Sequence, residues 1–294
     1  MSMWKKIAEW FKSLFADKPE PPPTPIPTPE PTPPPAGRFD HLIGIGMFIG
    51  LYPWRDNRGI YNAAPKDIKT LITQFAKAGG NLIQVQLLYI EGAVFGTRTG
   101  LRLDAGKVRD AQDFRDECRR NGVNVTFVLF DYTTLKKESK WALSPLNVIN
   151  GGPFSGSLDL YSNFPSVKQY VTEVVRMLDS DNVIWEIVNE GSKYDDFAAS
   201  VFLHLRSLGV TRITSSGPNI PGLWRFSPHG CTKASDVKAG LLPNTDGKAW
   251  KVEDVAAICK AIRKTENSGF VWDGATDAGY NWREFLREIE GIGT

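Results

Sequence analysis

From about residue 38 onward, short apolar runs alternate with segments in which apolar residues recur every three or four positions. The apolar runs are rich in β-branched residues and end at turn formers, which is typical of buried strands in a parallel sheet. The segments between them have the spacing of amphipathic helices that cover such a sheet. This alternation predicts an α/β fold, and its length fits a (β/α)8 TIM barrel of about 250 residues.

The predicted strands occupy residues 41–51, 81–89, 123–130, 183–190, 211–216, 224–229, 241–246 and 270–273. The predicted helices occupy residues 65–78, 104–121, 165–178, 195–208, 252–264 and 282–289. A long loop, residues 133–164, follows the third strand, and loops of this size in compact domains are usually functional. We expect it to lie over the active face, which an α/β barrel builds from the loops that follow its strands.

Two further segments precede the predicted barrel of residues 38–294. In residues 1–17, Trp4, Ile7 and Phe11 recur at helical spacing with lysines on the other side. Such an amphipathic helix suits a membrane interface or a groove on a larger assembly, such as a virion. The alternatives are that it folds back on the barrel or stays disordered. It lacks the continuous apolar core of a cleavable signal peptide.

The second segment, residues 18–37, contains more than half of the chain's 20 prolines. Proline at this density favours the extended polyproline II conformation, a semi-rigid spacer of about 3 Å per residue. A helix on a stiff tether suggests that the barrel is displayed at a distance from whatever holds it. We therefore expect an extracellular, envelope-associated or virion-displayed protein rather than a free cytoplasmic one.

Composition excludes several functions. A net charge of +2 and the lack of a basic run with interleaved aromatics give no indication of nucleic-acid binding. Cys118, Cys231 and Cys259 have no metal-ligand spacing, and we expect three free thiols. Gly44-x-Gly46 lacks the third glycine of a dinucleotide site, so we expect no cofactor, and no His or carboxylate cluster has metal-ligand spacing, so we expect no metal. The nine tryptophans fit a sugar-binding cleft, although large aromatics also fill cores.

One motif carries a resemblance to a known family. Trp185-Glu186-x-x-Asn189-Glu190 resembles the fourth-strand motif of the clan A glycoside hydrolases, the (β/α)8 group that contains cellulases and β-mannanases. The resemblance implies that Glu190 is the general acid/base and that Asn189 hydrogen-bonds the 2-hydroxyl of the sugar. Strand alternation points Glu186 the same way but deeper, and we predict that it is a buried, paired structural carboxylate.

Glycoside hydrolysis needs a second carboxyl group. In the clan this is a Glu that ends the seventh strand, and Asp246 occupies the matching position here, one methylene shorter. Retaining enzymes hold the two carboxyl groups about 5–5.5 Å apart, and inverting enzymes about 6.5–9.5 Å. We expect a retaining enzyme with Asp246 as nucleophile, with inversion or loss of activity as the alternatives. Asp273 and Asp277 are reserve candidates.

The resemblance also indicates residues that hold the sugar. His229 ends the sixth strand, where the clan places a substrate-contacting His, and Trp272 resembles its aromatic platform, with core packing as the alternative. Trp54 and Tyr132 follow the first and third strands and are further wall candidates. The sequence therefore predicts a hydrolase of a β-linked cell-wall, capsular or plant-type glycan. The alternative is an inactive carbohydrate-binding barrel on a stalk.

Overall fold

The computed structural model describes residues 39–47, 67–87, 103–131, 141–142, 146–150, 152, 154–156, 164–189, 195–217, 219–245, 252–272 and 282–290. The predicted N-terminal helix and proline-rich linker lie outside these residues, and both remain predictions. No helix in the described ranges is long and apolar enough to cross a membrane.

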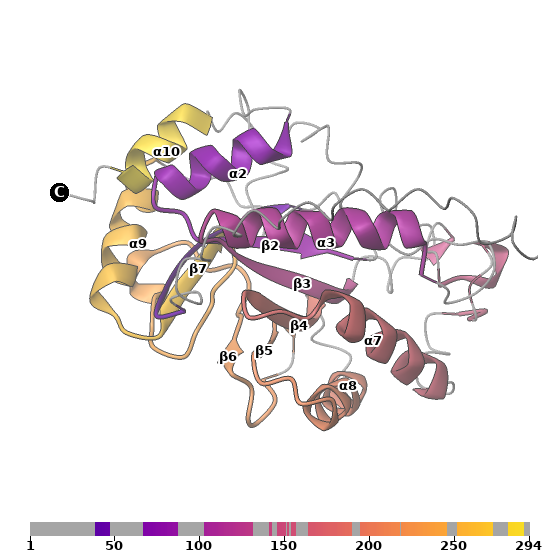
Figure 1. The fold of residues 1–294 in the computed structure, drawn as a ribbon. Helices are drawn as coiled ribbons and strands as arrows, with labels where there is room; N and C mark the ends of the chain where they lie inside the picture. Colours follow the sequence, from indigo (N-terminus) through magenta and orange to yellow (C-terminus); the bar gives the residue numbers. More distant parts are fainter. Residues whose placement is uncertain are drawn as a thin grey trace, which may run out of the picture. The chain divides into compact units, whose positions relative to one another are not determined.

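The described residues contain seven parallel strands in one curled sheet (Figure 1). They are β1 (His41–Met47), β2 (Leu82–Gln86), β3 (Asn124–Asp131), β4 (Val183–Asn189), β5 (Ile213–Ser215), β6 (Arg225–Phe226) and β7 (Ser268–Trp272). Their order in the sheet is β6-β5-β4-β3-β2-β1-β7. The prediction of a parallel α/β fold is therefore confirmed, and β7 is the strand that we expected to be the eighth.

The predicted seventh strand takes the form of isolated bridges. Residues 241–245, which we call the bridging segment, lie between β6 and β7. Within it, Leu241 pairs with Phe226, and Asn244 pairs with both His229 and Val271. A continuous ladder does not form partly because Pro243 has no N–H to donate. The bridging segment nevertheless joins the two outermost strands of the curled sheet.

Helices cover the outer face of this sheet (Figure 1). They are α2 (Ile68–Lys77), α3 (Ala105–Arg120), α7 (Phe164–Leu178), α8 (Asp195–Ser207), α9 (Val252–Lys264) and α10 (Trp282–Glu290), with short 3-10 turns η1 (Val148–Asn150) and η2 (Ala234–Asp236). Asp67 and Asp104 cap α2 and α3, accepting hydrogen bonds from Thr70 N (3.0 Å) and Gly106 N (2.8 Å). A carboxylate at this position satisfies backbone donors that have no partner within the helix.

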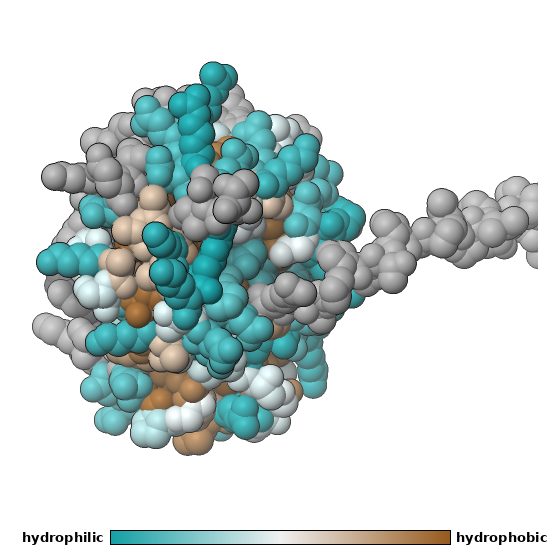
Figure 2. All heavy atoms as spheres, turned by 90° about the vertical axis from the view of Figure 1, so that its left-hand side faces the viewer, coloured by the Kyte–Doolittle hydropathy of each residue, from teal (hydrophilic) through white to brown (hydrophobic). Residues whose placement is uncertain are grey.

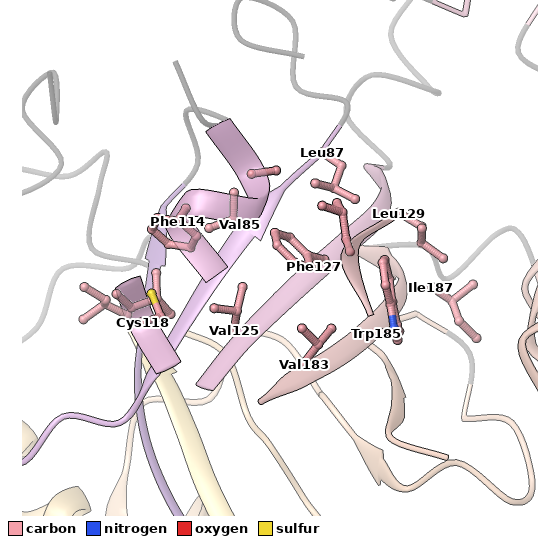
Figure 3. Close-up of a cluster of buried hydrophobic side chains, with 14 of the residues drawn as sticks. Val85, Leu87, Phe114, Cys118, Val125, Phe127, Leu129, Val183, Trp185 and Ile187 are labelled. Atoms are coloured by element: carbon pink, nitrogen blue, oxygen red, sulfur yellow. The ribbon is translucent and has the colours of Figure 1, made fainter. Parts of the chain in front are cut away.

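The main core lies between the strands and these helices. Figure 3 shows part of it, where Phe127 and Trp185 from neighbouring strands lie in the same layer as Phe114 of α3. The rings of Phe127 and Trp185 are 5.7 Å apart, and the indole nitrogen of Trp185 donates to Asp179 Oδ1 (2.8 Å). Side chains alternate along a strand, so the neighbours of Trp185 in β4 point to the inner face.

A second, smaller core fills the inner face. It consists of five fully buried aliphatic side chains: Leu42, Leu82, Ile184, Leu242 and Val271. Two glycines make room for them. A Cβ on Gly44 would lie 2.9 Å from Phe270 O, and one on Gly269 would lie 2.7 Å from both Leu42 Cβ and Leu242 Cδ1. Because Ile184 is in this cluster, Glu186 also belongs to the inner face of β4.

The strands begin at an end of the sheet that aromatic and arginine side chains fill. Phe39, which precedes β1, packs edge-on against Trp224 with ring centroids 5.7 Å apart. The guanidinium of Arg212 lies 4.7 Å from the Phe39 ring, and that of Arg225 lies 4.3 Å from the Trp224 ring. Arg225 is buried and donates to Ser268 O (2.9 Å) and to Phe39 O. Its contacts tie the starts of β1, β6 and β7 together.

The last helix has the amphipathic pattern predicted for residues 282–289. Trp282, Phe285 and Ile289 of α10 are buried, and Trp282 Nε1 donates to Gln74 Oε1 of α2 (2.9 Å). Arg283 and Glu284 are exposed. The side of the protein that carries α9 and α10 faces the viewer in Figure 2, and hydrophilic side chains cover much of it.

Candidate active site

Asn189 is the last residue of β4 and is 1% exposed. Its strand end is held on both sides. On one side it pairs with Asp131 of β3, and on the other Ser216, after β5, donates to Val188 O from its backbone N (3.2 Å) and its Oγ (3.0 Å). The position expected for the sugar-binding amide is thus a fixed strand terminus. Glu190, which follows it directly, lies outside the described residues.

His229 lies beyond β6, next to the bridging segment. Its backbone pairs with Asn244, and the N–H of Asn244 donates to Pro228 O (2.9 Å). The side chain of His229 is partly exposed, whereas Asn244 is fully buried. The structure therefore places His229 beside the segment that leads to Asp246. Asp246 itself is outside the described residues.

Trp272 ends β7 and is 3% exposed. Its ring centroid is 5.0 Å from that of Phe270 and 5.6 Å from that of Phe285 in α10, the latter in an edge-on arrangement. Phe270 and Trp272 share the outer face of β7, and Val271 between them belongs to the inner cluster. These contacts are those of the outer core, and the predicted stacking of Trp272 on a sugar stays a prediction.

Four further candidates cannot be placed by the structure. Tyr132 and Trp54, expected as walls of the cleft, and Asp273 and Asp277, the reserve carboxylates, all lie outside the described residues. Their roles remain predictions from the sequence.

A chain of hydrogen bonds crosses the inner face below the strand ends. Asn244 Nδ2 donates to Gln84 Oε1 (3.2 Å), and Gln84 Nε2 donates to Glu186 Oε2. We call these three residues the inner polar chain. Glu186 and Asn244 are 0% exposed and Gln84 is 5% exposed. The prediction that Glu186 is buried and paired is confirmed.

Sequence reasoning missed Gln84 and Asn244 as members of this site. A signal was present, because Gln84 and Gln86 are two polar residues at period-two spacing in a strand that is otherwise apolar. That spacing puts both amides on the same face as Leu82, which belongs to the inner cluster. Nothing in the local sequence identifies the partners of Gln84, which are Glu186, 102 residues later, and Asn244, 160 residues later.

The inner face changes from apolar to polar toward the strand ends. Along β2 the inward positions run from Leu82 to Gln84, along β4 from Ile184 to Glu186, and along the bridging segment from Leu242 to Asn244.

Three more polar side chains line this part of the sheet. Gln86, Thr126 and Thr214 are buried, and their side-chain oxygens have no hydrogen-bond partner among the described residues. Thr126 pairs with Gln84 in register, and Thr214 pairs with Glu186. Buried polar groups are normally hydrogen-bonded to protein or to ordered water. This part of the inner face therefore has the chemistry of a polar site and not of an aliphatic core.

No cluster of His, Cys, Asp and Glu that could hold a metal ion occurs within the described ranges. The sequence matches no protein-family model and no curated protein.

Solved structures are similar to the fold. A glycoside hydrolase family 5 enzyme from Prevotella bryantii is 8% identical, with a TM-score of 0.54 over 87% of this chain and 96% of that one. A β-mannanase from the blue mussel Mytilus edulis is 12% identical, with a TM-score of 0.54 over 86% of this chain and 92% of that one. An endo-1,4-β-mannanase from Eisenia fetida is 13% identical, with a TM-score of 0.54 over 88% and 94%.

This chain has a glycoside hydrolase fold. The match extends over most of its own length and nearly all of theirs, so the likeness concerns the whole architecture and not one βα unit. At 8–13% identity it establishes the arrangement of strands and helices alone. In (β/α)8 barrels that are enzymes, the active site is located at the carboxyl ends of the strands. Asn189 and the polar end of the inner face lie there.

Proposed function

We propose that this protein is a glycoside hydrolase that cleaves a β-linked poly- or oligosaccharide. The observation that carries the proposal is the position of Asn189. It is the final residue of the fourth strand in a glycoside hydrolase fold, and Glu190 follows it in the chain. The polar inner face below that strand end supports the same reading.

In this proposal Glu190 is the general acid/base and Asp246 is the nucleophile. Alternation along strands supports the pair. Glu190 is four residues after Glu186, and Asp246 is two residues after Asn244, and both of these reference residues belong to the inner polar chain. Glu190 protonates the glycosidic oxygen as the bond breaks, and Asp246 attacks the anomeric carbon, so hydrolysis retains configuration.

The remaining roles concern substrate binding. Asn189 hydrogen-bonds the 2-hydroxyl, His229 contacts the sugar next to Asp246, and Trp272, Tyr132 and Trp54 supply aromatic surface. No cofactor or metal is needed for this two-carboxylate mechanism. The substrate is a cell-wall, capsular or plant-type β-glycan. Residues 1–17 dock the protein on a membrane surface or a larger assembly, and residues 18–37 hold the barrel away from it.

Substitution of Glu190 tests the proposal directly. Glu190→Gln keeps the shape of the side chain but removes the proton donor, so hydrolysis should slow by several orders of magnitude. The measurement is the release of reducing ends from a panel of β-glucans, mannans and bacterial surface polysaccharides. If the wild-type protein releases no reducing ends from any of them, or if Glu190→Gln releases them at the wild-type rate, the assignment is wrong.

Substitution of Asp246 tests the second carboxylate. Asp246→Asn should slow hydrolysis by a similar factor, because an amide cannot form the covalent glycosyl intermediate. Asp246→Glu should be tolerated or faster, because it restores the clan's side-chain length. Full activity in Asp246→Ala would transfer the nucleophile role to Asp273 or Asp277. The configuration of the first-formed product, followed by NMR, separates retention from inversion.

The shortened side chain of Asp246 favours one other function. A barrel with its nucleophile out of reach would bind a glycan without cleaving it. Binding without release of reducing ends, unchanged by Glu190→Gln, would identify such a carbohydrate-binding protein.

A further inference from the structure

We propose that Gln84 is a positioning residue for the two proposed catalytic strands. Its side chain bonds to β4 on one side, through Glu186, and to the bridging segment on the other, through Asn244. These are the two elements that lead to Glu190 and Asp246. The inference rests on the proposed function, since it concerns the spacing of that pair.

The hydrogen bonds fix which way the amide of Gln84 faces. The Nε2 group of Gln84 faces Glu186 and donates to its Oε2 atom, as an amide N–H can only donate. The Oε1 atom is then turned toward Asn244, whose Nδ2 group donates to it over 3.2 Å. One planar amide thus connects two elements of the sheet, and movement of either one stretches a bond in the interior.

The bridging segment depends on such a side-chain bond more than a regular strand would. It meets β6 and β7 through isolated bridges, and Pro243 contributes no donor to them. Its backbone forms hydrogen bonds with the segments next to it in the curled sheet. Asn244 N donates to Pro228 O (2.9 Å), and Val271 N donates to Pro243 O (2.8 Å). Among the described side chains, that of Gln84 connects this segment across the interior to β2.

The spacing matters because the proposed nucleophile is an Asp. The separation of the carboxyl groups differs by only about 1–4.5 Å between a retaining and an inverting arrangement. The shorter side chain gives up roughly 1–1.5 Å of reach, so the position of the backbone before Asp246 must compensate for it. Burial of the inner polar chain excludes water, which strengthens each hydrogen bond and makes its loss costly.

The first test replaces Gln84 by Met, which has similar length and no hydrogen-bonding amide. We expect Gln84→Met to lower kcat by about 10–100-fold while KM changes less than about threefold, because misplacement by about 1 Å costs this much in rate. The matched control is Gln74→Met. Gln74 in α2 also makes a hydrogen bond through its side-chain amide, accepting from Trp282 Nε1 of α10 (2.9 Å), but it lies in the helix layer and away from the proposed site. This control should keep the wild-type kcat.

The second test is Gln84→Glu, with kcat followed against pH. Two carboxyl groups at hydrogen-bond distance share one proton, because both cannot ionise readily. While that proton is held, the introduced carboxyl group donates to Glu186 as the amide of Gln84 does, and kcat should approach the wild-type value. As pH rises that proton is lost and the two groups repel, so the alkaline fall of kcat should begin at lower pH in this variant than in wild type, where loss of the Glu190 proton sets it. A purely structural role for Gln84 would leave the shape of the pH profile unchanged.

The outcomes separate this inference from the proposed function. If wild type is active, Glu190→Gln is inactive, and both Gln84 variants keep the wild-type kcat and pH profile, the positioning role is wrong and the hydrolase assignment stays. If Gln84→Met does not fold, the pH profile of Gln84→Glu decides. If wild type cleaves no substrate, the positioning role is tested by crystal structures of wild type and of Gln84→Glu at high pH. An unchanged distance between the Cα atoms of Asn189 and Thr245 in Gln84→Glu at high pH would overturn the inference.

Discussion

Cys118 in α3 and Cys259 in α9 lie in the layer between the sheet and its helices, and Figure 3 shows Cys118 beside Phe114 and Val125. Burial raises the pKa of both thiols, to about 12 for Cys259. Cys231, after β6, is partly exposed. None of the three forms a disulfide in the structure, as expected from the sequence.

Because Cys118 and Cys259 are buried and Cys231 is partly exposed, we predict that only the thiol of Cys231 reacts readily with a thiol reagent. A raised pKa leaves almost no thiolate at about pH 8, and the thiolate is the nucleophile. In the native protein we expect Cys231 to react with Ellman's reagent in minutes, and Cys118 and Cys259 to react only after denaturant is added. The absorbance of the released thionitrobenzoate measures this. Rapid reaction in a Cys231→Ser variant would contradict the prediction.

Single residues also show what could be read from the sequence. The burial of Glu186 followed from alternation along one strand, which is a local property. Its bond to Gln84 joins residues 102 positions apart and depends on how the sheet curls, which no local pattern records. The packing of Trp272 in the outer core could have been predicted, because alternation places it on the same face as Phe270, two residues earlier.

Among the elements, the early strands were predicted well and the later ones less so. The strands from β1 to β4 lie within the predicted ranges, apart from the final residue of β3, because apolar residues concentrate in them and turn-forming residues bound them. The fifth and sixth predicted strands shorten to Ile213–Ser215 and Arg225–Phe226. Prolines and glycines in this part of the chain limit continuous pairing, and so the seventh predicted strand pairs at single residues.

Gly269 in β7 gives a prediction at this scale. A methyl group there would approach Leu42 Cβ and Leu242 Cδ1 to 2.7 Å, and Leu42 O to 3.0 Å, so β1 or the bridging segment would have to move. Gly269→Ala should lower the free energy of unfolding by about 1–3 kcal/mol, as overpacking does. Urea denaturation followed by far-UV circular dichroism measures it.

The control is Gly106→Ala in the first turn of α3. There the nearest atom to a new Cβ is the side-chain oxygen of Asp104, at 3.1 Å, which can adjust. Its unfolding free energy should stay within about 0.5 kcal/mol of the wild-type value. Equal destabilisation by the two substitutions would show that the inner cluster is not tightly packed at Gly269.

For the molecule as a whole, the described residues contain both layers of core that a barrel needs. Among the residues that the structure describes, the inner cluster and the helix-covered outer face consist of residues between 39 and 290. The sequence was most informative about this overall architecture, because a chain that alternates strands and helices repeatedly can form only a few folds.

Removal of residues 1–37 tests this organisation. The shortened chain should unfold within about 2 °C of the full chain, because it keeps both cores. If the proposed hydrolysis is observed, its rate should be the same in the two proteins. Binding to anionic lipid vesicles, measured by flotation, should be lost if residues 1–17 dock on membranes. A large drop in melting temperature would show that the N-terminal residues pack on the barrel.

The contacts of Phe39 determine where the preceding residues join the barrel. Its ring is clamped by Arg212 and Trp224, and its carbonyl by Arg225, at the pole where the strands start. Asn189 is at the opposite pole, roughly 20 Å away along a seven-residue strand. The described part of the chain therefore begins at the pole opposite to the one that carries Asn189 and the end of β4.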